Sequence, residues 1–253
     1  EVLGAGPGKG MALRAAFAQR GGRVYYDVAV TNHTQEPMAG IAFQLNKNFA
    51  GLTPTNPLFP VASVPPGATV SGSIELTVEP AKVEIKPGPV GATVQVAVKN
   101  QAGVLYYTDS VPLAPLLARD FQMPQPLYLS TWQAIPADAH GAAPIDGFPT
   151  ADVDAVQNAL LAAGIVLVAR RTVAVGVEAL YMAGKTLAGQ VFLFELQVNP
   201  TGARVTARSQ TEGFASLVPA GVHALLMDAL LPAHRPAPAA APAAPRNPLE
   251  GLL

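Results

Sequence analysis

The stretch Leu127-Tyr128-Leu129-Ser130-Thr131-Trp132-Gln133-Ala134-Ile135-Pro136 divides the chain into two parts with different patterns. It holds the single Trp, follows several Val-rich runs that look like strands, and precedes the first segment with a helical period. The residues before it therefore predict one kind of domain and those after it another. Taken alone, Trp132 is better explained by core packing than by a surface binding role, because aromatic side chains bury well.

The composition excludes several classes of function. The 253 residues suffice for one large or two modest domains, and 50% of them are apolar while 13% are charged, so the chain can bury a sizeable core. Lys and Arg are scattered and the formal net charge is -1, which argues against nucleic acid as a partner. Without Cys there is no disulfide framework and no thiolate metal site, in agreement with a reducing compartment.

The ends of the chain and its longest uncharged stretch argue against a membrane span. The opening Glu1-Val2-Leu3-Gly4 lacks the basic start and long apolar run of a signal peptide. Residues 48–74 carry no charge, but the prolines among them are incompatible with an ordinary membrane helix. We expect a soluble fragment of a larger protein, without direct membrane insertion. Residues 1–10 should be the end of a hinge or linker, and the Pro- and Ala-rich residues 232–253 a disordered tail.

Residues 11–118 predict an antiparallel β-sandwich. The valines of residues 23–31 share one face with Tyr26, and Gly21-Gly22 before them supplies a hairpin turn. The period of two returns at residues 41–45, 70–78, 94–98 and 104–113. Gly72 is a weak point in one of these runs. About six to eight short strands separated by Pro and Gly are typical of a two-sheet sandwich of the immunoglobulin type.

Residues 119–231 predict an α+β platform with grouped strands. A helix is expected at residues 150–163, with Thr150 as its cap and Asp152 in its first turn, where an acid suits the helix dipole. Strand candidates follow at residues 165–173, 177–182, 190–198 and 203–209, and a last helix at residues 219–231. In the third strand the aromatic residues share an apolar face and Glu195 points the opposite way. We therefore expect the helices on one side of the sheet.

No motif in the sequence identifies an enzyme. The His residues are not at metal-ligand spacing, no Gly-x-Ser-x-Gly elbow occurs, and the carboxylates are few and dispersed. We predict no catalytic residue, no cofactor and no metal site, and a binding protein rather than an enzyme. An enzyme or carbohydrate-handling protein with an accessory sandwich remains the alternative. An open aromatic groove around Trp132 would favour binding, and a deep pocket with paired carboxylates would favour the alternative.

Several stretches are more specific. They are Gln44-Leu45-Asn46-Lys47-Asn48-Phe49-Ala50-Gly51-Leu52-Thr53-Pro54, Val94-Gln95-Val96-Ala97-Val98-Lys99-Asn100, the opening stretch from Tyr128 to Pro136, Ala169-Arg170-Arg171, Leu180-Tyr181 and Phe194-Glu195-Leu196. The first three resemble F-N-K-N-x-x-G-x-x-P, Q-V-A-V-K-N and F-L-A-T-W-K-D-I-P in the C-terminal appendage (ear) of beta-adaptin, a large subunit of clathrin adaptor complexes. The resemblance runs from about Lys9 to Leu231. It implies an immunoglobulin-like sandwich followed by a platform, the same two halves that the residues predict independently.

The resemblance also implies a function. In that family the platform binds helical peptides that carry a Phe, a second apolar residue one turn later, and an Arg. Its functional residues correspond here to Trp132, Arg171, Tyr181 and Glu195, and the Tyr of a second site on the side of the sandwich corresponds to Tyr106. The implied partners are accessory-protein peptides, clathrin and, through a missing trunk, the rest of a heterotetrameric adaptor complex. The implied location is cytoplasmic, at the cytosolic face of clathrin-coated membranes.

Each corresponding platform residue has a physical role. Trp132 and Tyr181 offer a flat surface to a ligand Phe at low entropy cost. Glu195 can pair with the ligand Arg, and Arg171 can meet acidic residues that precede the Phe. The alternatives are core packing for the two aromatic residues and ordinary solvated charge for the other two.

Two departures from the family pattern affect the platform. Gln133 stands where the family has Lys, and His140 stands where the family has an acid. The second change removes a charge that would help to hold a ligand Arg. In the sandwich, Tyr107 alternates with Tyr106, so the sequence leaves open which of the two faces outward.

Overall fold

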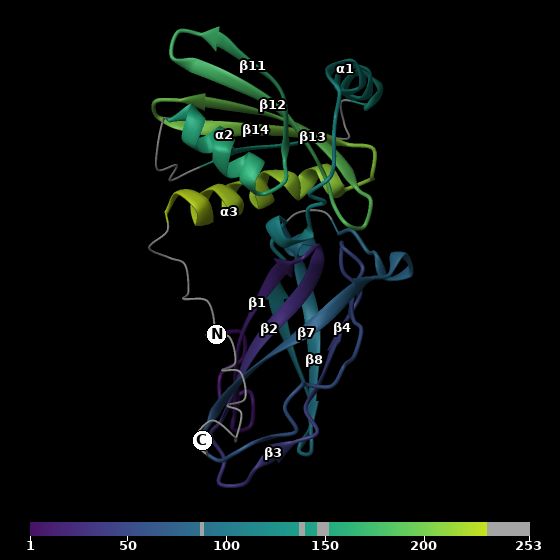
Figure 1. Ribbon diagram of the computed structural model, residues 1–253, viewed down its shortest axis with the longest axis vertical. Helices are drawn as coiled ribbons and strands as arrows, with labels where there is room; N and C mark the ends of the chain where they lie inside the picture. Colours follow the sequence, from purple (N-terminus) through teal and green to yellow (C-terminus); the bar gives the residue numbers. More distant parts are fainter. Residues whose placement is uncertain (87–88, 137–139, 146–151, 232–253) are drawn as a thin grey trace, which may run out of the picture.

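The computed structural model describes residues 1–86, 89–136, 140–145 and 152–231. It shows a molecule with a β-sandwich at one end and an α+β platform at the other (Figure 1). This arrangement confirms the predicted fold class. The predicted tail and the predicted cap Thr150 lie outside the described residues.

The sandwich consists of two main antiparallel sheets. In the first the strand order is β1-β2-β7-β5, in the second it is β4-β8-β9, and β3 and β6 form a separate pair. The strands are β1 Met11–Arg20, β2 Arg23–Asn32, β3 Met38–Ala39, β4 Ala42–Leu45, β5 Leu52–Pro54, β6 Ser63–Val64, β7 Thr69–Val78, β8 Thr93–Asn100 and β9 Gly103–Ser110. Short 3-10 helices lie at η1 Pro80–Lys82, η2 Pro89–Ala92 and η3 Ala114–Leu116. The valines of β2 and Tyr26 are buried, as their period of two predicts.

Glycines in the first sheet allow one tight turn and one close packing contact. Gly21 and Gly22 have φ angles of 56° and 77°, the left-handed conformation that both central residues of a type I′ hairpin turn require. At Gly72 a Cβ atom would lie 2.6 Å from the Pro60 ring and 2.8 Å from the Phe59 ring. Gly72 is therefore required for this close contact, although the sequence suggests only a weak point in the strand.

The first residues fold against the sandwich, although residues 1–10 were expected to be a linker. Leu3 is buried and forms an antiparallel bridge with Leu13 of β1. The intervening turn closes through backbone bonds such as Gly8 N–H to the Gly4 carbonyl oxygen, at 2.8 Å. Burial of the apolar Leu3 side chain supplies a reason for the segment to pack.

The platform is built on a five-stranded antiparallel sheet with the order β10-β14-β13-β12-β11. Its strands are β10 His140–Ile145, β11 Val166–Ala174, β12 Val177–Lys185, β13 Val191–Asn199 and β14 Gly202–Ser209. Its helices are α1 Gln125–Ala134, α2 Val153–Ala162 and α3 Val218–Leu230, with the 3-10 helix η4 Phe214–Ser216 before α3. The four predicted strands are all present. The edge strand β10 was missed because its sequence, His-Gly-Ala-Ala-Pro-Ile, has no alternation of large apolar residues.

Helix α2 begins slightly later than predicted. Asp152 is its N-cap, and the side chain accepts hydrogen bonds from the backbone N–H groups of Asp154 and Ala155, at 3.0 and 3.1 Å. The prediction that Asp152 lies in the first turn is therefore wrong, since the residue satisfies free N–H groups at the start of the helix. Gly164, with φ of 95°, ends the segment as predicted.

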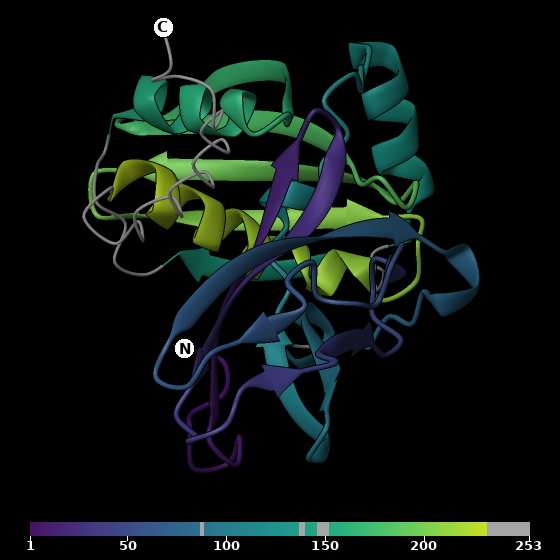
Figure 2. The same ribbon diagram turned by 60° about the horizontal axis from the view of Figure 1, so that its bottom comes forward.

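The two predicted helices, α2 and α3, share one side of the platform sheet as expected, but the helix that the sequence analysis missed, α1, lies on the opposite face. α2 and α3 cover the face that carries Phe192 and Phe194, while α1 covers Leu193 on the opposite face. Figures 1 and 2 show α1 apart from the other two helices. Most of the stretch from Leu127 to Pro136 is itself a helix, α1. The sequence does not reveal this helix, because two of its large apolar residues do not face the core: Leu127 and Leu129 are 51% and 49% exposed.

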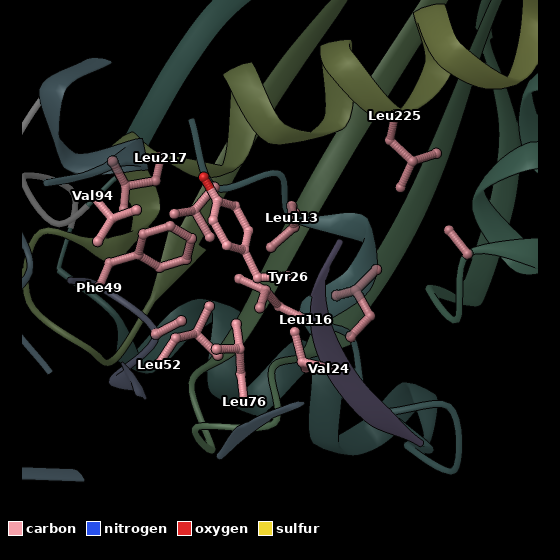
Figure 3. Close-up of a cluster of buried hydrophobic side chains, with 14 of the residues drawn as sticks. Val24, Tyr26, Phe49, Leu52, Leu76, Val94, Leu113, Leu116, Leu217 and Leu225 are labelled. Carbon is pink, nitrogen blue, oxygen red and sulfur yellow. The ribbon is translucent and has the colours of Figure 1, made fainter. Parts of the chain in front are cut away.

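A continuous hydrophobic core joins the sandwich to the platform. The rings of Phe49 and Phe214 lie 6.1 Å apart across the junction, and Figure 3 shows Leu217 of the platform near Phe49 and Val94 of the sandwich. The buried Gln190 side chain donates through Nε2 to the Phe49 carbonyl oxygen over 2.6 Å. Phe49 belongs to the F-N-K-N-like loop, so that motif builds the junction between the two halves.

A buried polar network lies between the two sheets of the sandwich. The Tyr26 hydroxyl donates to Asp109 Oδ2 over 2.7 Å and lies 3.0 Å from the Tyr107 hydroxyl. Burial raises the pKa of Tyr26 and of Tyr107 far above the ordinary tyrosine value, so both phenols stay neutral. Burial also raises the pKa of Asp109, although the bond from Tyr26 opposes that shift.

Tyr26→Phe is expected to destabilise the sandwich by about 1–3 kcal/mol, because it leaves Asp109 Oδ2 and the Tyr107 hydroxyl without this partner in a buried site. Urea unfolding followed by circular dichroism measures the change. Tyr107→Phe is the matched control, and it should cost less because the bond between Tyr26 and Asp109 remains. Equal costs for the two variants would show that the carboxylate contact is not the important one.

Candidate functional site

The face of the platform sheet under α1 carries the predicted site residues. Directly paired residues of neighbouring antiparallel strands point to the same face, so the register arranges this face in three rows. The first row is Ala183, Leu193 and Arg208, the second is Ala169, Tyr181, Glu195 and Thr206, and the third is Arg171, Ala179, Gln197 and Arg204. Helix α1 covers the first row, and most side chains of the other two rows are partly or fully exposed.

Trp132 and Tyr181 meet at the edge of α1 through a third aromatic residue. Tyr128, one turn before Trp132, is buried, and its ring is nearly parallel to that of Trp132, with centroids 5.6 Å apart. The same Tyr128 ring meets Tyr181 edge-on at 6.3 Å. Trp132 and Tyr181 both remain half-buried. The result is a supported aromatic surface that is partly open to solvent.

Tyr128 holds α1 on the sheet. Its hydroxyl donates to the Phe194 carbonyl oxygen over 3.2 Å. Burial raises the pKa of Tyr128 well above its ordinary value, and the nearby Glu195 carboxylate adds to the shift while Arg208 opposes it. The phenol therefore stays neutral and remains a hydrogen-bond donor.

Opposite charges flank the aromatic surface on the two neighbouring strands. Glu195 of β13 is the direct cross-strand neighbour of Tyr181, and its Oε1 accepts a hydrogen bond from Gln197 Nε2 over 2.5 Å. On the other side of Tyr181, its cross-strand neighbour in β11 is Ala169. Arg171 lies two residues after Ala169, on the same face of β11, and its side chain is exposed. The four predicted platform residues therefore lie on one face of the molecule.

Arg170 and Arg171 point to opposite faces of β11 and have different surroundings. Arg170 pairs with Asp154 of α2 at 2.5 Å and with Glu178 of β12 at 3.1 Å. The hydrogen bonds to Asp154 and Glu178 raise the pKa of Arg170, and the hydrogen bonds that Glu178 accepts from the Thr172 hydroxyl and from Arg170 lower the pKa of Glu178. Arg171 forms no ion pair with the residues that the structure describes. Arg170 is thus held by the fold, whereas Arg171 is exposed to solvent.

Two arginines on this face were not predicted as site residues. Arg208 lies in the first row, directly beside Leu193, and its guanidinium carbon is 4.5 Å from the centroid of the Trp132 ring. Arg204 lies in the third row and is exposed. In the last predicted strand, residues 203–209, the period of two puts Arg204 and Arg208 on the same face. The pairing of this strand with β13 then shows that this is the face of Glu195. That pairing is not visible in the sequence.

The predicted second site is on another sheet. Tyr106 of β9 is 61% exposed on the outer face of the β4-β8-β9 sheet, beside Ala97 of β8, which in turn pairs with Gln44 of β4. Tyr107 points inward and is buried. The structure therefore settles which of the two tyrosines faces outward, and it separates Tyr106 from the platform face.

The two departures from the family pattern have different places. Gln133 is exposed on α1. The His140 backbone pairs with Arg208 at the edge of the sheet, whereas the His140 side chain lies outside the described part. On the described face near Trp132, Glu195 is the single carboxylate in the three rows. Within the described ranges no group of three His, Cys, Asp or Glu side chains could hold a metal ion.

Comparison with known proteins agrees with this arrangement. Residues 118–226 match the family model described as beta2-adaptin appendage, C-terminal sub-domain. Over 76% of its length, the chain is 32% identical to the AP-1 complex subunit beta-1 of Rattus norvegicus and 31% identical to that of Homo sapiens. The chain belongs to the beta-adaptin appendage family. This confirms the resemblance that the sequence motifs indicate.

The match covers only a small part of the length of each relative. The chain spans 20% of the length of the two beta-1 subunits. It also matches the AP-1 complex subunit beta of Dictyostelium discoideum, with 23% identity over 78% of the chain and 21% of that relative. Among the helices that the structure describes, none has the length and apolar character needed to cross a bilayer.

The two neighbouring tyrosines of β9 allow a sharp test of exposure. Tyr106→Ala is expected to change the free energy of unfolding by less than about 0.5 kcal/mol, as at other exposed positions. Tyr107→Ala removes a buried ring and should cost about 3 kcal/mol or more. Urea unfolding of both variants measures this difference. A loss of similar size for the two would mean that Tyr106 belongs to the core.

Proposed function

We propose that this appendage binds short peptide motifs of trafficking accessory proteins through its platform. The ligand is a helical peptide with a Phe, a second apolar residue one turn later, and an Arg. Support comes from one arrangement: the half-buried Trp132 and Tyr181 form an open aromatic surface, with Glu195 on one side and Arg171 on the other. A flat aromatic surface suits a Phe, and the flanking charges suit a ligand Arg and acidic residues.

The aromatic surface contributes more of the binding energy than the charges do. Burying a Phe against Trp132 and Tyr181 is worth about 1.5–3 kcal/mol, whereas an exposed ion pair with Glu195 is worth about 0.2–1 kcal/mol. Glu195 also has an internal partner in Gln197. A single peptide covers little surface, so the dissociation constant should be on the order of micromolar.

The wider role that we propose follows the family. The parent protein acts as the beta subunit of a clathrin adaptor complex in vesicle-mediated transport, and the appendage helps to engage clathrin at the cytosolic face of coated membranes. Residues 11–118 and 119–231 act as two subdomains, with Tyr106 marking a second site on the sandwich. The appendage is not an enzyme in this proposal. The alternative of an enzyme or carbohydrate-handling protein is less well supported, since Glu195 has no second carboxylate beside it in the described rows.

Trp132→Ala should weaken binding of a helical peptide that carries Phe, Leu one turn later and Arg by about 1.5–3 kcal/mol, because the Phe loses its aromatic contact. Glu195→Gln should reduce the binding free energy of the same peptide by at most about 1 kcal/mol. Calorimetric titration of the wild type and both variants measures these changes, with a Phe→Ala peptide as the control. Equal losses for the two variants, or no binding to the wild type, would contradict the proposed platform site.

The two sites should select different partners. Tyr106→Ala is expected to lose one subset of the proteins that the appendage captures from cytosol and to keep the subset that Trp132→Ala loses, because Tyr106 lies in β9 of the sandwich and Trp132 in helix α1 of the platform. Quantitative mass spectrometry of the captured proteins measures both subsets. If the two variants lose the same partners, there is one site or one coupled surface instead of two.

A further inference from the structure

Arg208 holds both the ring of Trp132 and the backbone that carries it. Its guanidinium carbon lies 4.5 Å from the ring centroid, within the range of a cation–π contact. Its Nη1 donates to the Trp132 carbonyl oxygen over 2.6 Å and to the Ile135 carbonyl oxygen over 3.3 Å. One side chain from β14 thus contacts the proposed Phe-binding residue at two points.

Helix α1 needs this support at its C-terminal end. The helix has only 10 residues, no basic residue in its last turn, and no side-chain cap at its N-terminus. Carbonyl groups in a last turn lack intrahelical donors, and a positive charge there is favoured by the helix dipole. So short a helix is marginal without tertiary contacts. Arg208 supplies the missing donor and charge from the neighbouring sheet.

The orientation of the guanidinium is set by α1 and not by an acid. Its Nε is buried without a hydrogen-bond partner in the described part of the chain, a costly situation for a donor. No carboxylate among the described residues forms an ion pair with Arg208. The flat guanidinium lies over the Trp132 ring while its Nη1 donates to two carbonyl groups, and Lys has no planar group that can stack on the ring in the same way.

We infer that Arg208 is a positioning residue of the platform: it fixes Trp132 in place so that a ligand Phe meets a preset aromatic surface. This inference rests on the proposed function of the platform and deepens it. A ring that is already held in its bound orientation loses little entropy when the ligand arrives, so the gain appears as affinity. Arg208 itself acts through Trp132.

The test uses the fluorescence of Trp132, the single Trp of the chain. In the free protein, Arg208→Met should shift the emission maximum and raise the acrylamide quenching constant about twofold, because the ring loses its charged neighbour and moves more freely. The variant should also bind a Trp-free helical peptide that carries Phe, Leu and Arg more weakly, with a dissociation constant about fivefold higher or more by calorimetry. Arg208→Lys should fall between Arg208→Met and wild type in both measurements.

Arg204→Met is the matched control, since Arg204 lies on the same strand and the same face in the third row. It should leave the Trp132 emission and quenching unchanged. A melting curve of each variant defines a measuring temperature at which all of them are folded. A merely structural role of Arg208 would lower the melting temperature but leave the emission at this measuring temperature unchanged. Unchanged emission and quenching in Arg208→Met, or changed emission with unchanged peptide affinity, would overturn the inference. If the wild type binds no such peptide, the proposed function fails, whereas the fluorescence comparison of the free proteins still tests the contact between Arg208 and Trp132.

Discussion

The platform depends on the alternation of side chains along β13, the central strand of its sheet. Phe192 and Phe194 point toward α2 and α3, and Leu193 between them points toward α1. All three are fully buried, and each contributes about 1.5–3 kcal/mol by its burial. A slip of one residue in register would exchange the two faces and carry Glu195 into the apolar core. The register of this one strand therefore decides which side of the sheet bears the site.

The same strand connects the site to the sandwich. The Phe192 ring lies 5.9 Å from that of Phe214, which in turn lies 6.1 Å from that of Phe49. Gln190, just before β13, donates to the Phe49 carbonyl oxygen. The platform face is thus built on a strand that is anchored in both halves of the molecule. Sites on rigid elements present their side chains more accurately than sites on loops, which suits the proposed binding of short peptides without reorganisation.

The sequence predicts those parts of the fold in which one local period dominates. Residues 23–31 alternate strictly, and the structure has a strand there with the expected buried face. Helix α1 could not be found in this way, since Tyr128 and Trp132 are its only side chains in the apolar cluster on the sheet, while two of its leucines are exposed. The contact between Arg208 and Trp132 depends on a strand pairing and a helix position that no local pattern encodes. Trp132, Tyr181, Glu195 and Arg171 were singled out by resemblance. The register explains why Tyr181, Glu195 and Arg171 share a face, and the packing of α1 on that face brings Trp132 to it.

In the proposed peptide complex, the charges of the platform face favour an acidic ligand segment over a basic one. Its described rows hold three arginines, Arg171, Arg204 and Arg208, against the single acid Glu195. Arg208 is occupied by α1, and Glu195 already accepts a hydrogen bond from Gln197. The exposed Arg171 and Arg204 therefore dominate the field that an approaching peptide meets. Such fields speed up encounter and set orientation more than they add affinity, and salt screens them. Acidic residues near the ligand Phe would thus guide the peptide onto the face, and the contact of the Phe with Trp132 and Tyr181 would keep it there.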